Sequence, residues 1–254
     1  MLKDNNITSV LFDLDGTLAD TSQDMCDSLN RILDIHKLKK VQCTELKKYI
    51  SRGAIGIIEF ASMVNGRSVD SSLIRSEFLE DYKDNCFINT RINNNMDSLI
   101  DYLIDKDIKV GVVTNKHSRY VNKIIKGLNL EDKLNCVITG DMVSHPKPDI
   151  DGLVKASEIT KCNLSDTVYV GDDERDIIAG RNAGMMTVVA DFGFISRDTN
   201  IKLWKADLII KGGLVVLPNY KIEKLDIGIS DGKICEIGSL DKSLAKQVID
   251  ANGL

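Results

Sequence analysis

The chain has 254 residues, a formal net charge of −5 and 43% hydrophobic residues, a composition typical of a folded globular protein. The acidic balance and the lack of a clustered basic stripe argue against a non-specific nucleic-acid binder. The polar start MLKDNNITSV and the lack of a long apolar run predict neither a secretory signal nor a membrane span, so we expect a cytoplasmic protein. The six scattered cysteines are therefore expected to be reduced thiols.

The chain begins with an apolar run that predicts a strand at about Ser9–Asp13. The next segment is rich in apolar residues at helical spacing. SQDMCDSLNRILDIH predicts a helix with Ser22 as its N-cap, and SSLIRSEFLEDYKDN predicts another. Between them, YISRGAIGII places Ser51, Arg52 and Gly53 ahead of an apolar helix.

From about residue 97 the pattern changes to alternating helices and short apolar strands. Helical patterns precede the strands IKVGVVT, CVIT, TVYVGD and MTVVA, as expected where helices cover both faces of a sheet. We predict an α/β fold with a Rossmann-like parallel sheet core and ligands bound beyond the carboxyl ends of its strands. The core is expected at 1–19 and 90–206, an inserted α-helical cap at 20–89, and a last core strand with a short C-terminal β appendage at 207–254.

Carboxylates follow two of the predicted strands. VLFDLDGT places Asp13 and Asp15 on the same side of a strand end, where their repulsion costs about 3 kcal/mol. Thr114 in VGVVT and Asp172 in VYVGD are expected at the same edge. A hard cation such as Mg²⁺ takes oxygen ligands and would turn the repulsion into attraction. The simpler alternative is that the first pair lies in a solvated turn and that Asp172–Asp176 caps a helix.

Four motifs, in order and spacing, resemble those of the haloacid-dehalogenase-like hydrolase superfamily. They are DLDGT at Asp13–Thr17, VVTN at Val112–Asn115, Lys147 in HPKPD, and GDDERD at Gly171–Asp176. The likeness runs from about residue 7 to residue 210. The helical insert resembles the cap of the phosphoglycolate-phosphatase-like branch.

The resemblance implies a phosphatase that works through a phosphoaspartate. Asp13 would attack phosphorus, and Asp15 would protonate the leaving group and then activate water. Thr114 and Lys147 would hold the transferring phosphoryl oxygens. The dehalogenase branch lacks an acid at the position of Asp15, because a halide leaves without a proton, so this residue favours phosphoryl transfer.

The resemblance also implies a Mg²⁺ site. Its ligands would be Asp13, the backbone carbonyl of Asp15, and Asp172. Asp176 would lie outside these ligands and orient the metal's water or Lys147.

Substrate selection is expected in the cap. The guanidinium of Arg52 suits a carboxylate, which favours a carboxylate-bearing phosphate ester, although a solvated surface cation is an equal alternative. Asn115 in the second motif is a further predicted substrate-binding residue.

The chain resembles phosphoglycolate phosphatases and also the branch that acts on N-acetylmuramic acid 6-phosphate. Two less favoured functions are a pyrophosphatase and a non-catalytic phospholigand-binding module. We expect a monomer or homodimer that acts on a small-molecule ester.

The segment from about Asp207 to Leu254 has a different pattern, with short strands separated by turns. Asp231–Gly232 is a hairpin signal. The segment resembles the first strands of cyclic amidohydrolases such as hydantoinases and dihydroorotases. The metal-binding HxH motif that follows in those enzymes is missing, because no histidine occurs after His145. We expect an appendage without a catalytic role; a fusion and a truncated reading frame are the competing interpretations.

Overall fold

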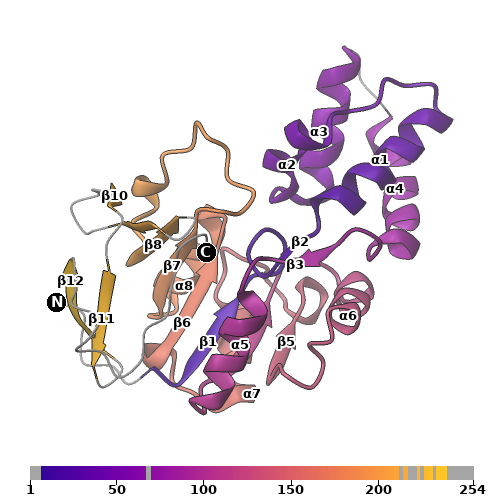
Figure 1. The fold of residues 1–254 in the computed structure, drawn as a ribbon. Helices are drawn as coiled ribbons and strands as arrows, with labels where there is room; N and C mark the ends of the chain where they lie inside the picture. Colours follow the sequence, from indigo (N-terminus) through magenta and orange to yellow (C-terminus); the bar gives the residue numbers. More distant parts are fainter. Residues whose placement is uncertain are drawn as a thin grey trace.

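The computed structural model of the chain describes residues 7–66, 70–211, 214–216, 222–223, 226–230 and 233–238. Within these residues an eight-stranded sheet forms the centre of the molecule (Figure 1). Its parallel strands are β1 (Ser9–Phe12), β4 (Lys109–Val113), β5 (Cys136–Ile138), β6 (Thr167–Gly171), β7 (Met186–Ala190) and β8 (Leu208–Lys211). Two antiparallel strands, β9 (Leu214–Val216) and β10 (Ile222–Glu223), extend one edge.

The strand order β10-β9-β8-β7-β6-β1-β4-β5 places β1 between β6 and β4. Both neighbours are parallel to β1, and Phe12 lies in register with Val112 and Val170. The carboxyl ends of these three strands therefore meet at one edge. The predicted α/β class with a parallel sheet core is confirmed.

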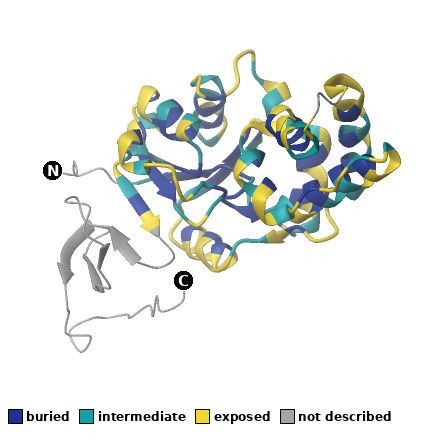
Figure 2. Ribbon diagram, turned by 90° about the horizontal axis from the view of Figure 1, so that it is seen from above, coloured by how far each residue is buried: buried dark blue, intermediate teal, exposed yellow. Residues whose placement is uncertain are grey.

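Helices cover both faces of the sheet, which explains why its parallel strands are mostly apolar. These helices are α5 (Met96–Asp105), α6 (Ser118–Gly127), α7 (Asp151–Thr160) and α8 (Glu174–Asn182). Phe12 belongs to the same buried cluster as Ile100 of α5, whereas Leu11 belongs to a second cluster with Leu153 of α7. Adjacent side chains of β1 thus point to opposite faces. Figure 2 shows the sheet as a buried layer between the helices.

Four helices form a separate group beside the core, which we call the cap (Figure 1). They are α1 (Ser22–Ile35), α2 (Cys43–Ile50), α3 (Gly53–Asn65) and α4 (Ser71–Asn85). The cap connects to the core through β2 (Ala19–Asp20) and β3 (Arg91–Ile92), which pair antiparallel. The chain entering the cap therefore lies beside the chain leaving it.

The buried carboxylate of Asp24 fastens this connection. It accepts backbone N–H groups from Ile88, Asn89 and Thr90 at 2.7–2.9 Å. Burial opposes ionisation of Asp24, but these donors lower its pKa below the ordinary value. The start of α1 is thus tied to the segment that follows α4.

The predicted N-cap of α1 is wrong by one residue. The N-cap is Thr21, and Ser22 is the first helical residue. The carboxylate of Asp20 accepts both the N–H and the hydroxyl of Ser22, at 3.0 and 2.6 Å. The Thr21 hydroxyl makes no capping bond and donates instead to Asp15. The hydroxyl of Ser22 therefore donates to Asp20, whereas the predicted N-cap role would make it an acceptor.

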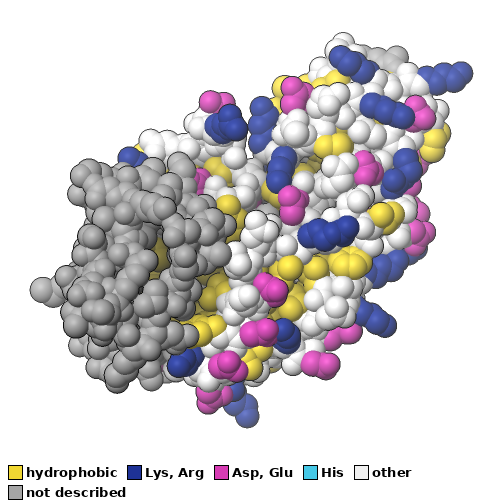
Figure 3. Space-filling view, in the orientation of Figure 1, with side chains coloured by type: hydrophobic (Ala, Val, Ile, Leu, Met, Phe, Trp, Pro, Cys, Tyr) yellow, Lys and Arg dark blue, Asp and Glu magenta, His cyan; other side chains and the backbone are white. Residues whose placement is uncertain are grey.

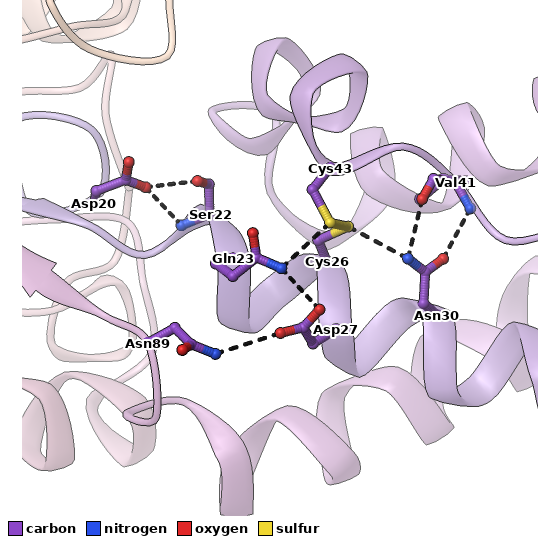
Figure 4. The surroundings of a disulfide bond; sticks show 9 residues. All are labelled: Asp20, Ser22, Gln23, Cys26, Asp27, Asn30, Val41, Cys43 and Asn89. Carbon is purple, nitrogen blue, oxygen red and sulfur yellow. Dashed lines mark hydrogen bonds between the residues drawn. A yellow bond between two sulfur atoms is a disulfide. The ribbon is translucent and has the colours of Figure 1, made fainter.

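The expectation of six reduced cysteines is also wrong for one pair. Cys26 of α1 and Cys43 at the start of α2 form a disulfide across 17 residues (Figure 4). Gln23 and Asn30 donate side-chain N–H groups toward its sulfurs. Packing of α2 against α1 brings the two thiols together, and spacing along the chain does not reveal this. Cys86, Cys136 and Cys162 are free.

The C-terminal segment contains two strands that pair antiparallel, β11 (Asp226–Ser230) and β12 (Lys233–Gly238). The predicted turn, Asp231–Gly232, lies outside the described residues.

Among the helices of the described ranges, none has the length and apolar character required to span a bilayer. On the coloured part of the face drawn in Figure 3, Lys and Arg side chains are interspersed with Asp and Glu side chains.

Candidate active site

Three polar residues follow the three neighbouring strands β6, β1 and β4. Asp13 comes directly after β1, Thr114 after β4 and Asp172 after β6. All three residues are at least nine-tenths buried. The backbone N–H of Asp13 donates to Val170, which continues the pairing of β1 with β6. The parallel register therefore brings together residues that are far apart in the sequence.

Three buried carboxylates gather at this edge. Asp13, Asp172 and Asp176 each offer an oxygen, and these oxygens lie within 4.8 Å of one another. Asp172 is held by the Phe194 N–H at 2.6 Å and the Thr17 hydroxyl at 3.1 Å. We call the three residues the carboxylate cluster.

Gly16 makes room for this cluster. Its φ of +88° is a conformation that L side chains rarely adopt, and a Cβ there would collide with the Asp172 carboxylate. The chain therefore turns sharply after β1 and passes directly beside Asp172. Gly16 of DLDGT thus serves both the turn and the close approach.

The cluster is short of positive charge. Burial raises the pKa of Asp13 to about 6, with Lys147 opposing the rise and Asp176 adding to it. Burial, together with Asp13 and Asp176, raises the pKa of Asp172 well above its usual range. Buried carboxylates are stabilised by pairing or by a metal ion. Closely spaced carboxylate oxygens suit a hard divalent cation, so the residues present fit Mg²⁺.

Lys147 is the cation at the base of the cluster. Its Nζ lies 2.7 Å from Asp13 Oδ1 and 2.7 Å from Asp176 Oδ1. It also contacts the Tyr169 hydroxyl at 2.7 Å and the Val113 carbonyl at 3.0 Å. Burial alone would lower the pKa of Lys147, but Asp13 and Asp176 raise it well above its ordinary value. The lysine is therefore charged and held in place.

Asn115 holds the backbone of Lys147. Its amide oxygen accepts the Lys147 N–H and its amide nitrogen donates to the Lys147 carbonyl, both at 2.9 Å. The sequence predicts that the Asn115 side chain binds substrate, but both of its polar atoms contact the backbone of Lys147. The neighbouring Thr114 hydroxyl accepts the backbone N–H of Lys116 at 3.3 Å.

Asp15 has different neighbours from Asp13. Its oxygens lie 2.8 and 3.1 Å from the Nζ of Lys116, and the Thr21 hydroxyl donates to Oδ1 at 2.5 Å. The carboxylate is 16% exposed and does not belong to the carboxylate cluster. The two acids of DLDGT therefore have separate cations, Lys147 for Asp13 and Lys116 for Asp15.

The model of the family described as haloacid dehalogenase-like hydrolase matches residues 10–190, a range that includes the cap, the carboxylate cluster and both lysines. The chain belongs to the haloacid dehalogenase-like hydrolases. Among similar proteins, an N-acetylmuramic acid 6-phosphate phosphatase of Pseudomonas putida is 31% identical over 204 residues, 80% of this chain and 92% of that protein. A phosphoglycolate phosphatase of Xanthomonas campestris is 30% identical over 203 residues, 80% and 91% respectively.

The fold of this haloacid dehalogenase-like hydrolase also occurs in solved structures. The crystal structure of a predicted phosphoglycolate phosphatase from Haemophilus somnus has a TM-score of 0.73 at 21% identity, covering 81% of this chain and 94% of that one. The crystal structure of a phosphoglycolate phosphatase, described as putative, from Lactobacillus delbrueckii has a TM-score of 0.71 at 23% identity. It covers 81% of this chain and 95% of that one. These similarities concern the fold alone.

The fourth motif of the hydrolase has two roles, which the sequence presented as alternatives. Asp173 is the N-cap of α8 and accepts the backbone N–H of Arg175 at 2.9 Å. Asp176 Oδ2 accepts the Asp173 N–H at 3.0 Å, which completes a capping box, while its Oδ1 contacts Lys147. Asp172 belongs to the carboxylate cluster. Helix capping therefore orients Asp176 toward the site.

Arg52 lies in the cap, where it is the N-cap residue of α3. Its guanidinium pairs with Glu59 at 2.5 Å, and its side chain is 56% exposed. The preceding residue, Ser51, accepts a hydrogen bond from Arg175 of the core at its carbonyl, and its own buried hydroxyl has no partner among the described residues. The turn between α2 and α3 thus touches the fourth motif.

From the sequence we assign no role to three further residues of the site: Lys116, Tyr169 and Arg175. Lys116 directly follows VVTN, and a cation beside a motif that is expected to bind phosphate is a usable signal. Tyr169 lies two residues before Gly171 on the same strand, so alternation places both on one face. Arg175 is inside GDDERD, but its contact with the cap depends on the tertiary structure.

Proposed function

We propose that this hydrolase is a Mg²⁺-dependent phosphomonoesterase that cleaves a small phosphate ester through a phosphoaspartate on Asp13. The observation that carries the proposal is the buried Asp13 carboxylate, 2.7 Å from Lys147 Nζ and grouped with Asp172 and Asp176. The named phosphatases among its relatives support the same reaction class.

In the first step, an Asp13 oxygen forms a bond to phosphorus and the ester P–O bond breaks. Asp15 gives its proton to the departing alkoxide. In the second step, Asp15 takes a proton from water, whose oxygen bonds to phosphorus and releases phosphate and free Asp13. The division of work requires that Asp15 and Asp13 have separate environments, as their different lysine partners provide.

Charge on the phosphoryl oxygens is held by Lys147 and by the Thr114 hydroxyl. Asp13, Asp172 and the backbone carbonyl of Asp15 would hold Mg²⁺, which neutralises phosphoryl charge when bound. Asp176 keeps the ammonium of Lys147 beside Asp13, because it contacts the same nitrogen at 2.7 Å.

For the substrate we propose a carboxylate-bearing ester, 2-phosphoglycolate or N-acetylmuramic acid 6-phosphate, selected by the cap at 20–89. Arg52 is the candidate carboxylate-binding residue. Asn115, whose side-chain amide contacts the Lys147 backbone at both ends, would contribute to substrate binding by holding Lys147. Glu59 already pairs with Arg52, so a substrate carboxylate can bind Arg52 only if this ion pair breaks. Pyrophosphate is the third substrate to be compared. A cytoplasmic location and a monomer or homodimer remain predictions.

The test is Mg²⁺-dependent phosphate release from these three compounds and p-nitrophenyl phosphate. Asp13→Asn is expected to abolish turnover of every ester, because the amide cannot attack phosphorus. Undiminished turnover by this variant would refute the phosphoaspartate. If a wide range of esters gives no Mg²⁺-dependent release, the alternative is a non-catalytic phospholigand-binding module.

A further inference from the structure

Lys116 is a cation with a largely buried side chain, and the proposed reaction assigns it no role. It follows Asn115 in the loop after β4, and its side chain is only 7% exposed. Its Nζ reaches both oxygens of the Asp15 carboxylate, at 2.8 and 3.1 Å, although the two residues are 101 positions apart. Burying an ammonium is costly without a partner, and here the partner is Asp15.

The cap supplies the other side of this arrangement. Nζ of Lys116 lies 4.8 Å from the ring centroid of Tyr82, a fully buried residue of α4. A cation over an aromatic face is held electrostatically. Lys116 is thus enclosed between a core carboxylate and a cap ring, and it has little freedom to leave Asp15.

These contacts define the orientation of the Asp15 carboxylate. Lys116 contacts both oxygens, while the Thr21 hydroxyl donates only to Oδ1. Without Lys116 the plane of the carboxylate would be free to turn about the one hydrogen bond that remains to it among the described residues, from Thr21. Proton transfer to a leaving oxygen requires the acid within hydrogen-bond reach and correctly aimed.

We propose that Lys116 is a positioning residue that aims Asp15 at the leaving-group oxygen. The inference rests on the proposed function, since it assigns Asp15 the proton transfer. Lys147 cannot take this role, because its Nζ is already engaged by Asp13, Asp176, Tyr169 and Val113. The two lysines thus serve different steps: Lys147 the phosphoryl group and Lys116 the proton.

Leaving-group chemistry distinguishes these roles. An alkoxide needs a proton to depart, whereas p-nitrophenolate is a stable anion that leaves without one. For Lys116→Met we expect kcat/KM to fall about 10- to 100-fold for the better alkyl substrate, 2-phosphoglycolate or N-acetylmuramic acid 6-phosphate, and less than about 3-fold for p-nitrophenyl phosphate. Lys116→Arg keeps the charge and is expected to recover part of the loss. Lys126→Met, on the exposed side of α6, is the matched control for losing a lysine.

A double-mutant cycle tests whether Lys116 acts through Asp15. In an Asp15→Asn background, Lys116→Met is expected to cause no further loss of p-nitrophenyl phosphate or alkyl ester turnover. Equal losses for both substrates, or additive losses in the double variant, would overturn the positioning role. If Lys116→Met fails to fold, Lys116→Gln is the variant that removes the charge, and Lys116→Arg remains the variant that keeps it.

Failure of the proposed function has a different outcome. If the wild type hydrolyses neither the alkyl esters nor p-nitrophenyl phosphate, or if Asp13→Asn retains full activity, the proposed phosphatase mechanism is wrong. The inference about Lys116 is then wrong as well. If the wild type is active and Asp13→Asn is inactive, only the substrate ratio and the cycle decide the role of Lys116.

Discussion

The Nζ of Lys147 lies 2.7 Å from Oδ1 of Asp13, although 134 residues separate them in the chain. The same nitrogen contacts Asp176 at 2.7 Å, so one buried cation holds a carboxylate from the end of β1 and another from the first turn of α8. The side chain of Lys147 is only 6% exposed, so solvent screens this pair little. The contact links the stability of the core to the proposed chemistry.

Lys147→Met should therefore damage both stability and turnover. Removing one partner from a buried ion pair costs about 3–5 kcal/mol, because the remaining charges are uncompensated. Phosphate release should fall by at least about 100-fold. Urea denaturation in metal-free buffer and steady-state kinetics measure the two effects, with Lys126→Met as control. A stable and active Lys147→Met would contradict the assigned role.

Stability in metal-free buffer should depend on pH through Asp13. Burial raises the pKa of Asp13 from 3.8 to about 6, so between these values the folded state holds a proton that the unfolded state releases. The contribution of Asp13 to stability is therefore fully present below pH 3.8 and is lost as pH rises to about 6 and above. Thermal unfolding of wild type and Asp13→Asn across this range measures the difference. Identical pH profiles would contradict the raised pKa.

Mg²⁺ should reverse this loss. A metal that binds the folded state raises the free energy of unfolding, and it needs ionised carboxylates. The increase in Tm caused by Mg²⁺ should therefore be larger at about pH 7.5 than at about pH 5. Asp172→Asn should remove most of the increase. An equal increase in this variant would place the metal elsewhere.

Gly16→Ala should disrupt the carboxylate cluster, because its Cβ would collide with Asp172 in addition to straining a positive φ. Gly184→Ala is the matched control, since Gly184 has a φ of +77° but open space around it. We expect a cost of about 1–3 kcal/mol from strain at either position and a loss of Mg²⁺-dependent activity only at Gly16. Equal activities in the two variants would show that the close approach is unimportant.

The Cys26–Cys43 disulfide should stabilise the cap. Closing a loop of 17 residues contributes about 3 kcal/mol in the chain-entropy model. Cys43→Ser should lower the free energy of unfolding by that order, whereas Cys162→Ser should have a small effect. Alkylation without reductant, followed by mass spectrometry, should leave Cys26 and Cys43 unmodified. Labelling of Cys43 in the unreduced protein would contradict the pairing.

Arg52→Ala should raise KM for carboxylate-bearing esters more than for p-nitrophenyl phosphate. Glu59→Gln is the informative partner, because it removes the carboxylate that occupies Arg52 at 2.5 Å and should lower the same KM. Equal changes in KM for both substrate types would show that Arg52 is a solvated surface cation that does not select the substrate.

The sequence alone predicts much of the core. Alternating apolar helices and strands identify the parallel sheet, because side-chain periodicity is a local property. The position of Asp13, Thr114 and Asp172 at strand ends follows from the same pattern. Once the strands are parallel and adjacent, these residues must share an edge. The motif order then indicates the family, which the match over residues 10–190 shows.

Only the tertiary structure decides which partners these residues have. The Thr21 hydroxyl donates to Asp15 and does not cap α1. The hydroxyl of Ser22 donates to Asp20, and Cys26 forms a disulfide with Cys43. The assignment of Lys116 to Asp15 and Lys147 to Asp13 depends on how loops from different strands pack together. Periodicity determines the face on which a side chain lies. Its partner is determined by which elements cross there, and the crossing is fixed by packing of the whole core.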